Sequence, residues 1–540
     1  MTAHFHRRRL IEIAVLAGIL VLAAATRLPG LDQRGPWDSD QGHDMRVLAA
    51  LVERGEVPLL GPPTSIGTFH HGAAYYALLA PAALVSGADP VAVTREIALL
   101  GIGAVAAAWW LGRLVGGRAA AAVAGLLTAL SPSGIDESTF IWNPNPIPLA
   151  AALAFAGALV AWRSGRARWW LLAGLGAMLT MQLHVLGLVV VPPLVAAWIA
   201  DVRRRRSDGR PRRPAVLAGA GALAIIAAGY VPLVIHELTS DFSETRAIVA
   251  YLAGGGGGGG VDVATRVLIV GLRAATWPIA GLVTDRPAGT VLALASMVGL
   301  SVAAIVLARR EDRAPAAWLA WTLGWSVVAL AVAAPSLATI TPGLPNDHYH
   351  AFLDPVVLAL VGVGLARLAS VGAPGRGAAN PESHGGPGRG AVTPGRLAAG
   401  ALAVLLAGIA ITSWPPAVAP DGGWPLADAS AAEVLDITGD RQIRLDGIPP
   451  FKSADALRFP LERRGADVTT DVAGTQSSAY GDVVLVCDPL FDEVVGAACG
   501  GPAEDRWIAE TPGLPKLGLE RRIDAGPRRV ISIYAVAGAP

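Results

Sequence analysis

The chain is dominated by apolar blocks about 16 to 22 residues long that alternate with short polar segments. A helix of that length crosses the hydrocarbon core of a lipid bilayer. Hydrophobic residues make up 53% of the 540 residues and charged residues 16%, whereas a soluble domain contains about 25% charged residues. We therefore expect an all-α polytopic membrane protein. Disorder, collagen and a water-soluble enzyme are excluded as descriptions of the whole chain.

Eleven apolar blocks are predicted to be transmembrane helices. They are roughly 10–25, 92–112, 118–131, 146–162, 169–182, 184–200, 215–235, 290–308, 316–335, 351–370 and 396–413. Two further stretches, 72–87 and 266–284, are shorter or interrupted, and we expect them to lie on the outer surface as interfacial helices. If both crossed the membrane, the count would be thirteen.

Arginine-rich segments predict the orientation, because short cytoplasmic loops carry an excess of basic residues. These segments are Arg113 with Arg118, Arg163 to Arg168, Asp201 to Arg213, Arg309 to Arg313 and Arg367 to Arg396. Eleven spans place all of them in the cytoplasm, with the N-terminus inside and the C-terminus outside. The preference for Arg over Lys is typical of a high-GC bacterial genome, so we expect a bacterial plasma membrane.

The composition divides the chain into a membrane domain, 1–415, and a soluble outer domain, 424–540. The membrane domain includes a large first outer loop, 27–91, and a Gly- and Pro-rich cytoplasmic linker, 371–395, that is expected to be disordered. The outer domain is predicted to be a small α/β unit. Its expected strands are Arg441 to Leu445, Asp482 to Cys487 and Arg529 to Val536, and its expected helix is Ser453 to Arg464, with Ser453 as N-cap.

Both cysteines of the chain, Cys487 and Cys499, lie in this outer domain. An extracytoplasmic compartment permits disulfides, so the two could form a bridge. The alternative is a pair of small core residues that are not bonded.

The first outer loop is the richest in candidate catalytic residues, with Asp38, Asp40, His43 and Asp44 within seven positions. The pattern becomes helical from about Gly42, so Asp40 would lie near a helix N-terminus, where the dipole favours the ionised carboxylate. An ionised carboxylate there could act as a general base that takes a proton from a hydroxyl group. Alternatively, Asp38 or Asp40 is simply an N-cap.

Other outer loops carry polar residues next to predicted spans. They are Asp136, Glu137, Asn143 and Asn145 in the second loop, His184 in a tight hairpin, and Asp347, His348, Tyr349 and His350 in the last loop. The asparagines could serve only as turn residues, and His184 could simply bond a neighbouring helix end. Polar groups at the mouth of a span are costly unless they are paired or hydrated, which favours a shared cavity.

At these residues the chain resembles the GT-C superfamily of membrane glycosyltransferases, in its protein O-mannosyltransferase and aminoarabinose-transferase branch. Asp40-Gln41 takes the place of the family's acidic pair, and the stretch from His70 to Leu79 takes that of a Pro-Pro-Leu-Phe-Tyr-Trp-like segment. Thr94-Arg95-Glu96 and His348-Tyr349 match two later elements. The likeness covers roughly residues 1 to 370. Gln41 replaces the usual Glu, and His70-His71 replace prolines or Lys-Pro.

The resemblance implies that a sugar is transferred from a polyprenyl-phosphate donor to an envelope glycan, lipid or protein on the outer face. Asp40 would be the catalytic base, with Asp38 and Asp44 in reserve, and direct displacement would invert the anomeric centre. Phosphate partners would come from Arg46, Arg95, His184, His348, His350 and Tyr349. The full predicted substrate-binding set also contains Gln41, His43, His70, His71, Tyr75, Asp136, Glu137, Asn143, Asn145 and Asp347.

No cofactor is expected, although a divalent metal is left open. Asp38, Asp40, His43, Asp44, His70 and His71 form a mixed oxygen and nitrogen ligand set that suits Mn or Zn, but no H-E-x-x-H or C-x-x-C signature occurs. A net charge of +1 gives no basic footprint for nucleic acid. The alternative functions are a transporter or flippase for a lipid-linked sugar, and a non-catalytic envelope assembly protein.

Overall fold

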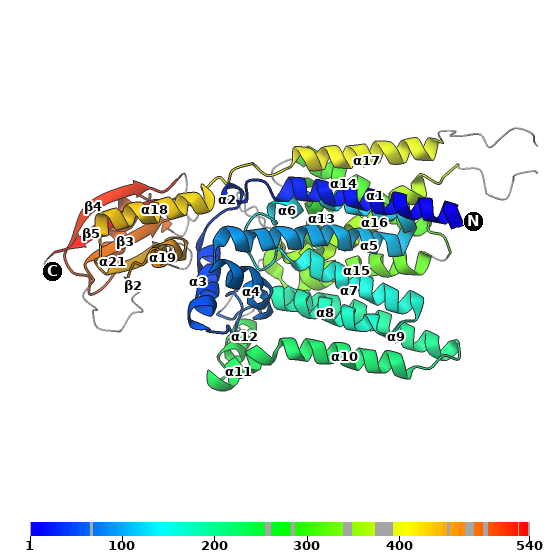
Figure 1. Cartoon of the computed structure of the whole chain (residues 1–540), viewed down its shortest axis with the longest axis horizontal. Helices are drawn as coiled ribbons and strands as arrows, with labels where there is room; N and C mark the ends of the chain where they lie inside the picture. Colours follow the sequence, from blue (N-terminus) through cyan, green and yellow to red (C-terminus); the bar gives the residue numbers. More distant parts are fainter. Residues whose placement is uncertain are drawn as a thin grey trace, which may run out of the picture.

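The chain folds into a long bundle of apolar helices with a small sheet domain at one end, as seen in a computed structural model (Figure 1). The structure describes all residues except 1, 65–67, 254–260, 282–286, 311, 339–347, 373–392, 451–453, 470–479, 490–494, 527–528 and 538–540. The predicted fold class is confirmed. Most of the expected linker, and Ser453, lie outside the described residues.

The long helices include a counterpart for every predicted span and one helix in the stretch 266–284, which was predicted to be interfacial. They are α1 (Thr2–Arg27), α5 (Pro90–Leu130), α7 (Ile147–Ser164), α8 (Trp169–Leu183), α9 (Val191–Ser207), α10 (Arg213–Gly229), α13 (Val263–Ala280), α14 (Pro287–Val306), α15 (Arg313–Ala333), α16 (Asp354–Leu368) and α17 (Pro394–Thr412). Shorter elements connect them: α2 (Leu31–Arg34), α3 (Ser39–Arg54), α4 (Ala74–Ser86), α6 (Pro132–Asp136), α11 (Val231–Thr239), α12 (Ser243–Ala253), and the 3-10 helices η1 (Val185–Val190), η2 (Pro335–Ala338) and η3 (His348–Leu353).

By length and hydropathy, nine helices in the described part of the chain could cross a membrane, or ten if the bent pair α10 and α11 is one span. This count treats α5 as one span and leaves out α8, which has 15 residues. It also includes α13, which we expected to be interfacial. In the described structure α13 packs most extensively against α14 and α15, and it also contacts α6, η2 and η3.

The 41-residue α5 is a hairpin of two helical segments rather than one rod. Gly117 has a φ of 82°, and a Cβ on Gly112 would lie 2.9 Å from the carbonyl oxygen of Ala120. In a straight helix those two residues would be about 12 Å apart, at 1.5 Å per residue. The chain therefore reverses at Gly117, which yields the two separate segments predicted at 92–112 and 118–131.

The arginine-rich segments gather at the end of the bundle that lies away from the sheet domain. There Glu12 of α1 binds Arg113 and Arg118, each at 2.6 Å. Arg367, at the end of α16, pairs with Asp312 before α15. We call this the arginine end, and the opposite end, which carries the sheet domain, the domain end.

The C-terminal domain contains a five-stranded mixed sheet of order β2-β1-β3-β5-β4. Its strands are β1 (Ile443–Ile448), β2 (Val468–Thr469), β3 (Asp482–Cys487), β4 (Leu517–Asp524) and β5 (Val530–Val536), and its helices are α18 (Gly423–Thr438), α19 (Ala454–Arg463) and α21 (Pro502–Glu510). The strand β4 was not predicted, because it is an edge strand whose mostly exposed residues include three charged neighbours, Glu520, Arg521 and Arg522.

A disulfide joins Cys487, at the end of β3, to Cys499 in the segment before α21. These are the two cysteines for which the sequence left a bridge or an unbonded pair open. The bond ties the buried centre of the sheet to the start of α21.

Candidate functional site

Helix α3 carries the three candidate carboxylates of the first loop across the domain end of the bundle (Figure 1). Asp38 is its N-cap and accepts a hydrogen bond from the backbone N–H of Asp40 at 2.9 Å. Gln41 completes a capping box by accepting from the backbone N–H of Asp38, also at 2.9 Å. The N-cap interpretation therefore describes Asp38, whose carboxylate stabilises the helix start.

Asp44 is buried and accepts hydrogen bonds from two tyrosines of α4. The hydroxyls of Tyr75 and Tyr76 each donate to a different oxygen of Asp44 at 2.8 Å. Burial raises the pKa of Asp44 to about 7, although the nearby His43 and the two tyrosine hydrogen bonds oppose that rise. Asp44 thus joins α3 to α4 through a carboxyl group whose pKa is raised.

Asp40 precedes Asp44 by one helical turn, so the two carboxylates lie on the same face of α3. Asp40 is half-buried, in the first turn of the helix.

The second loop is held to its neighbours by amide side chains from the predicted set. Gln41 donates to the carbonyl of Ile141 at 2.8 Å, which fixes the start of α3 against this loop. Asn143 donates to the carbonyl of Leu183 at 2.5 Å, beside His184. Asn145 donates to Phe140 within its own loop, at 2.7 Å. The bond of Asn145 is local and matches the turn-chemistry alternative, whereas those of Asn143 and Gln41 bring three distant segments together.

Three histidines from different segments meet at the domain end. The ring of His184 lies 4.8 Å from that of His71 and 5.4 Å from that of His348, measured between centroids. Tyr349 lies 4.0 Å from His348, and Trp142 of the second loop lies 4.2 Å from it. We call these five residues the histidine cluster. It was not predicted as a unit, because its members are separated by up to 278 positions in the chain.

Two members of the histidine cluster are held neutral. Burial, reinforced by the neighbouring His184 and His70, lowers the pKa of His71 well below its usual value. Burial and the nearby His348 do the same for His184. At pH 7 these two rings can donate or accept hydrogen bonds, but they supply no positive charge.

The remaining predicted residues are placed in different surroundings. Arg46 binds Glu462 at 2.8 Å and Asp455 at 3.4 Å, both in α19. His70 binds Glu244 of α12 at 2.9 Å. The others are His43 beside Asp455, Arg95 exposed near the start of α5, Asp136 at the end of α6, Glu137 and His350, both buried, and Asp347, which lies outside the described residues.

The pKa of Asp136 is also shifted. Removal of its carboxyl from water raises the pKa to about 6, and the positive charge of Arg34 opposes the rise. Asp136 would therefore be mostly ionised at pH 7.

Most of the candidate metal ligands have other partners. Within the described part of the chain, no group of three or more His, Cys, Asp or Glu side chains could hold a metal ion. Asp38 and Asp44 use their oxygens for the helix cap and the tyrosines, and His70 faces Glu244.

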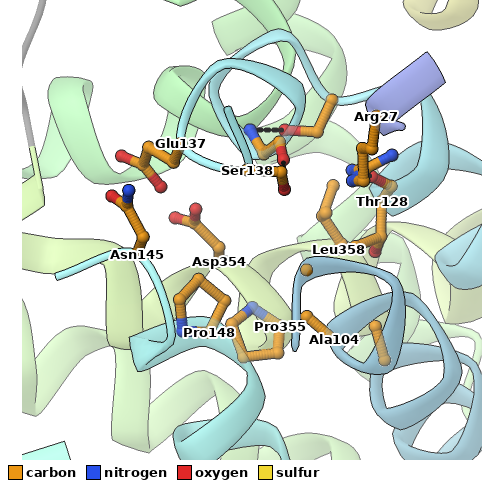
Figure 2. Close-up of a pocket in the computed structure, with 14 residues that line it drawn as sticks. Arg27, Ala104, Thr128, Glu137, Ser138, Asn145, Pro148, Asp354, Pro355 and Leu358 are labelled. Atoms are coloured by element: carbon orange, nitrogen blue, oxygen red, sulfur yellow. Dashed lines mark hydrogen bonds between the residues drawn. The ribbon is translucent and has the colours of Figure 1, made fainter. Parts of the chain in front are cut away.

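A small cavity with several polar side chains in its lining lies inside the bundle next to the second loop (Figure 2). It has a volume of about 30 Å³, and Glu137, Asn145 and Asp354 turn toward one another on one side, with Arg27 on the other. That volume holds one or two waters rather than a sugar. The sequence analysis did not select Arg27 and Asp354. Each is an ionisable residue near the end of an apolar block, and that position could have identified them.

A larger groove, of about 280 Å³, lies between α3 and α19 and is lined by Arg46, Glu53, Arg54, Glu462 and Arg463. Arg46 and Glu53 lie on the face of α3 that is turned away from Asp40, given 100° per residue. The groove is therefore separated from the Asp40 carboxylate by the body of the helix.

The comparisons with known proteins agree with this architecture. The family described as dolichyl-phosphate-mannose-protein mannosyltransferase matches residues 70–231. The apo structure of ArnT from Cupriavidus metallidurans superposes with a TM-score of 0.57 at 14% identity, over 98% of both chains. The structure of the same protein bound to undecaprenyl phosphate gives 0.56 at 13%, again over 98% of both chains.

A third similar structure is the arabinofuranosyltransferase AftD from Mycobacteria, with a TM-score of 0.52 at 14% identity, over 98% of this chain and 40% of AftD. A sequence search of curated proteins finds no significant match. The predicted resemblance is confirmed for the fold: the chain is similar in fold to ArnT and to part of AftD.

Proposed function

We propose that the protein transfers a hexosyl or pentosyl group from a polyprenyl-phosphate donor to a glycan, lipid or protein of the bacterial cell envelope. One observation carries this proposal: α3, the second loop and the histidine cluster come together at the domain end of the bundle. In a bundle whose spanning helices are nearly free of charge, such a cluster marks a site of function. The fold is also that of ArnT, which has been solved with undecaprenyl phosphate.

Asp40 is the proposed general base. It would take the proton of the acceptor hydroxyl while that oxygen bonds to the anomeric carbon and the bond from that carbon to the phosphate oxygen breaks. The polyprenyl phosphate leaves with the bonding electrons, and direct displacement inverts the anomeric centre. Asp38 and Asp44 remain in reserve; Asp38 caps α3, and Asp44 accepts from the tyrosine pair.

The leaving phosphate would be stabilised by hydrogen bonds from the histidine cluster, including the hydroxyl of Tyr349, and by the charge of Arg95. Neutral His71 and His184 suit hydrogen bonding rather than ion pairing. Arg46 is a weaker candidate than the sequence indicated, because Glu462 and Asp455 already balance its charge. Such preorganised groups act most strongly in a site with little water.

The arginine end would face the cytoplasm, since the basic segments gather there and short cytoplasmic loops are enriched in arginine. The domain end, with its disulfide, would then lie in the oxidising extracytoplasmic space. A donor presented from the outer leaflet would keep its prenyl tail in hydrocarbon and its phosphate at the domain end.

The lipid extract of a deletion strain tests this function. We expect the strain to accumulate one polyprenyl-phosphate sugar and to lose one envelope glycan. Wild-type protein should reverse both effects, whereas Asp40→Asn should not. Glu56→Gln, which changes an exposed carboxylate of the same loop, is the matched control and should behave as wild type. Full complementation by Asp40→Asn would remove Asp40 from the mechanism and favour a transporter or an assembly protein.

A further inference from the structure

The C-terminal domain is fastened to the first loop, the segment that carries Asp40. Helix α19 packs along α3, and the two elements are more than 400 positions apart in the sequence. Nothing in the proposed chemistry uses α19 directly. The contacts of α19 therefore indicate a role of the C-terminal domain in positioning α3.

Helix α3 presents two opposite faces. Asp40 and Asp44 lie on the face that meets the tyrosines of α4. Gly42 and Arg46 lie about 200° and 240° around the helix from Asp40, at 100° per residue, and they face α19. The helix is thus held between α4 on one side and α19 on the other, and a shift of α19 moves the carboxylate face.

Gly42 is the point of closest approach. A Cβ at this position would lie 1.9 Å from the backbone carbonyl oxygen of Asp455, whereas real Cβ atoms keep at least 3.0 Å from their neighbours. Even a methyl group would therefore force α3 and α19 apart by about 1 Å or more. The backbone of α19 is seated directly on α3.

Charged side chains fix the register of this contact. Asp455 binds His43 and Arg46, each at 3.4 Å. Arg46 also binds Glu462 at 2.8 Å, and Arg458 binds the other oxygen of Glu462 at 2.7 Å. The pairs run along one side of α19, so sliding or rotation of that helix would break several of them together.

Trp37 fastens the chain immediately before α3. Its indole N–H donates to the carbonyl of Ala456 at 2.8 Å, and its backbone N–H donates to Asp421 at 2.9 Å. Its ring lies 4.6 Å from that of Trp424 and 5.9 Å from that of Phe459. All four partners belong to the C-terminal segment, so the cap of α3 is positioned by that segment as well.

We propose that the C-terminal domain positions the first loop for catalysis, with Asp455 as a positioning residue that acts through His43 and Arg46 on α3. The expected effect on catalysis rests on the proposed transfer reaction. The packing of α19 against α3 does not, and it can be measured separately.

The test is Gly42→Ala in the full-length protein, which adds one methyl group and removes no polar contact. The matched control is Gly324→Ala in α15, where an added Cβ meets nothing within 4 Å. Hydrogen exchange of residues 39–54 reports the seating. The transfer rate and the KM for the lipid-linked sugar purified from the deletion strain report catalysis. A second variant, Asp455→Asn, weakens the charge pairs and leaves Gly42 in place.

We expect both variants to exchange faster in residues 39–54 and to lower kcat about 10- to 100-fold, the effect of a misplacement near 1 Å, with KM unchanged. Gly324→Ala should match wild type in every measurement. Wild-type exchange and turnover in Gly42→Ala would overturn the proposal, as would a raised KM with kcat intact or equal losses in Gly324→Ala. If wild type transfers nothing, the proposed function fails, and the exchange data alone decide whether α19 orders α3.

Discussion

Replacement of Asp44 by Asn should remove a large part of the pH dependence of stability. Asp44 is fully buried and lies outside the spanning helices, where Tyr75 and Tyr76 donate to its two oxygens. Burial raises its pKa from the usual 3.8 to about 7. The folded protein therefore holds a proton at this site that the unfolded chain releases between pH 4 and 7.

The direction and the size of this change in the free energy of unfolding follow from proton linkage. Because the pKa is raised on folding, the stabilisation is fully present below pH 3.8 and is lost as the pH rises through 7. Between pH 5 and 8 the free energy of unfolding should fall by about 2–3 kcal/mol through this group alone. Asp136, with a pKa of about 6, contributes a smaller fall of the same sign that the substitution leaves in place.

The assay is thermal unfolding of purified wild type and Asp44→Asn in the same detergent, at constant ionic strength, from pH 5 to pH 8. The wild-type midpoint should drop with rising pH, and the variant should show a clearly shallower drop. Parallel curves for the two proteins would refute the reasoning, since they would mean that Asp44 does not retain its proton on folding.

Two further predictions concern contacts at the domain end. Cys487→Ser should destabilise the C-terminal domain by about 2–4 kcal/mol, so that limited proteolysis cuts residues 424–540 sooner; a digestion rate equal to that of wild type would contradict a structural role for the disulfide. Glu244→Gln should weaken the contact of α12 with His70 and speed hydrogen exchange in residues 243–253 while α19 stays unchanged; equal exchange in α12 would show that this contact does not hold it.

The membrane architecture was predictable from the sequence because every helix that crosses the hydrocarbon core must be long and apolar. Each of the eleven expected blocks corresponds to a helical segment in the described structure, including the two halves of α5. The turn at Gly117 has a local sequence signal, a pair of glycines followed by an arginine. The edge strand β4 was missed because its charged residues carry no apolar alternation.

The roles of individual residues in the candidate site were harder to predict from the sequence. Asp38, Asp40 and Asp44 are the same residue type within seven positions. The cap formed by Asp38 is a local contact, but the tyrosine hydroxyls that donate to Asp44 come from another helix, which the local sequence does not indicate. Likewise, no local pattern pairs Arg46 with Asp455, because the contact joins segments 409 positions apart. Residue type and position at a span's mouth indicated where polar groups gather, but not which groups meet.

The most direct test of the account is release of polyprenyl phosphate in vitro. Purified protein in liposomes would be given the lipid-linked sugar from the deletion strain together with envelope acceptor from the same strain, and products would be followed by mass spectrometry. Wild type is expected to yield free polyprenyl phosphate and a glycosylated acceptor, and Asp40→Asn is expected to yield neither. Intact donor moved across the bilayer by wild type, or full product formation by Asp40→Asn, would contradict it.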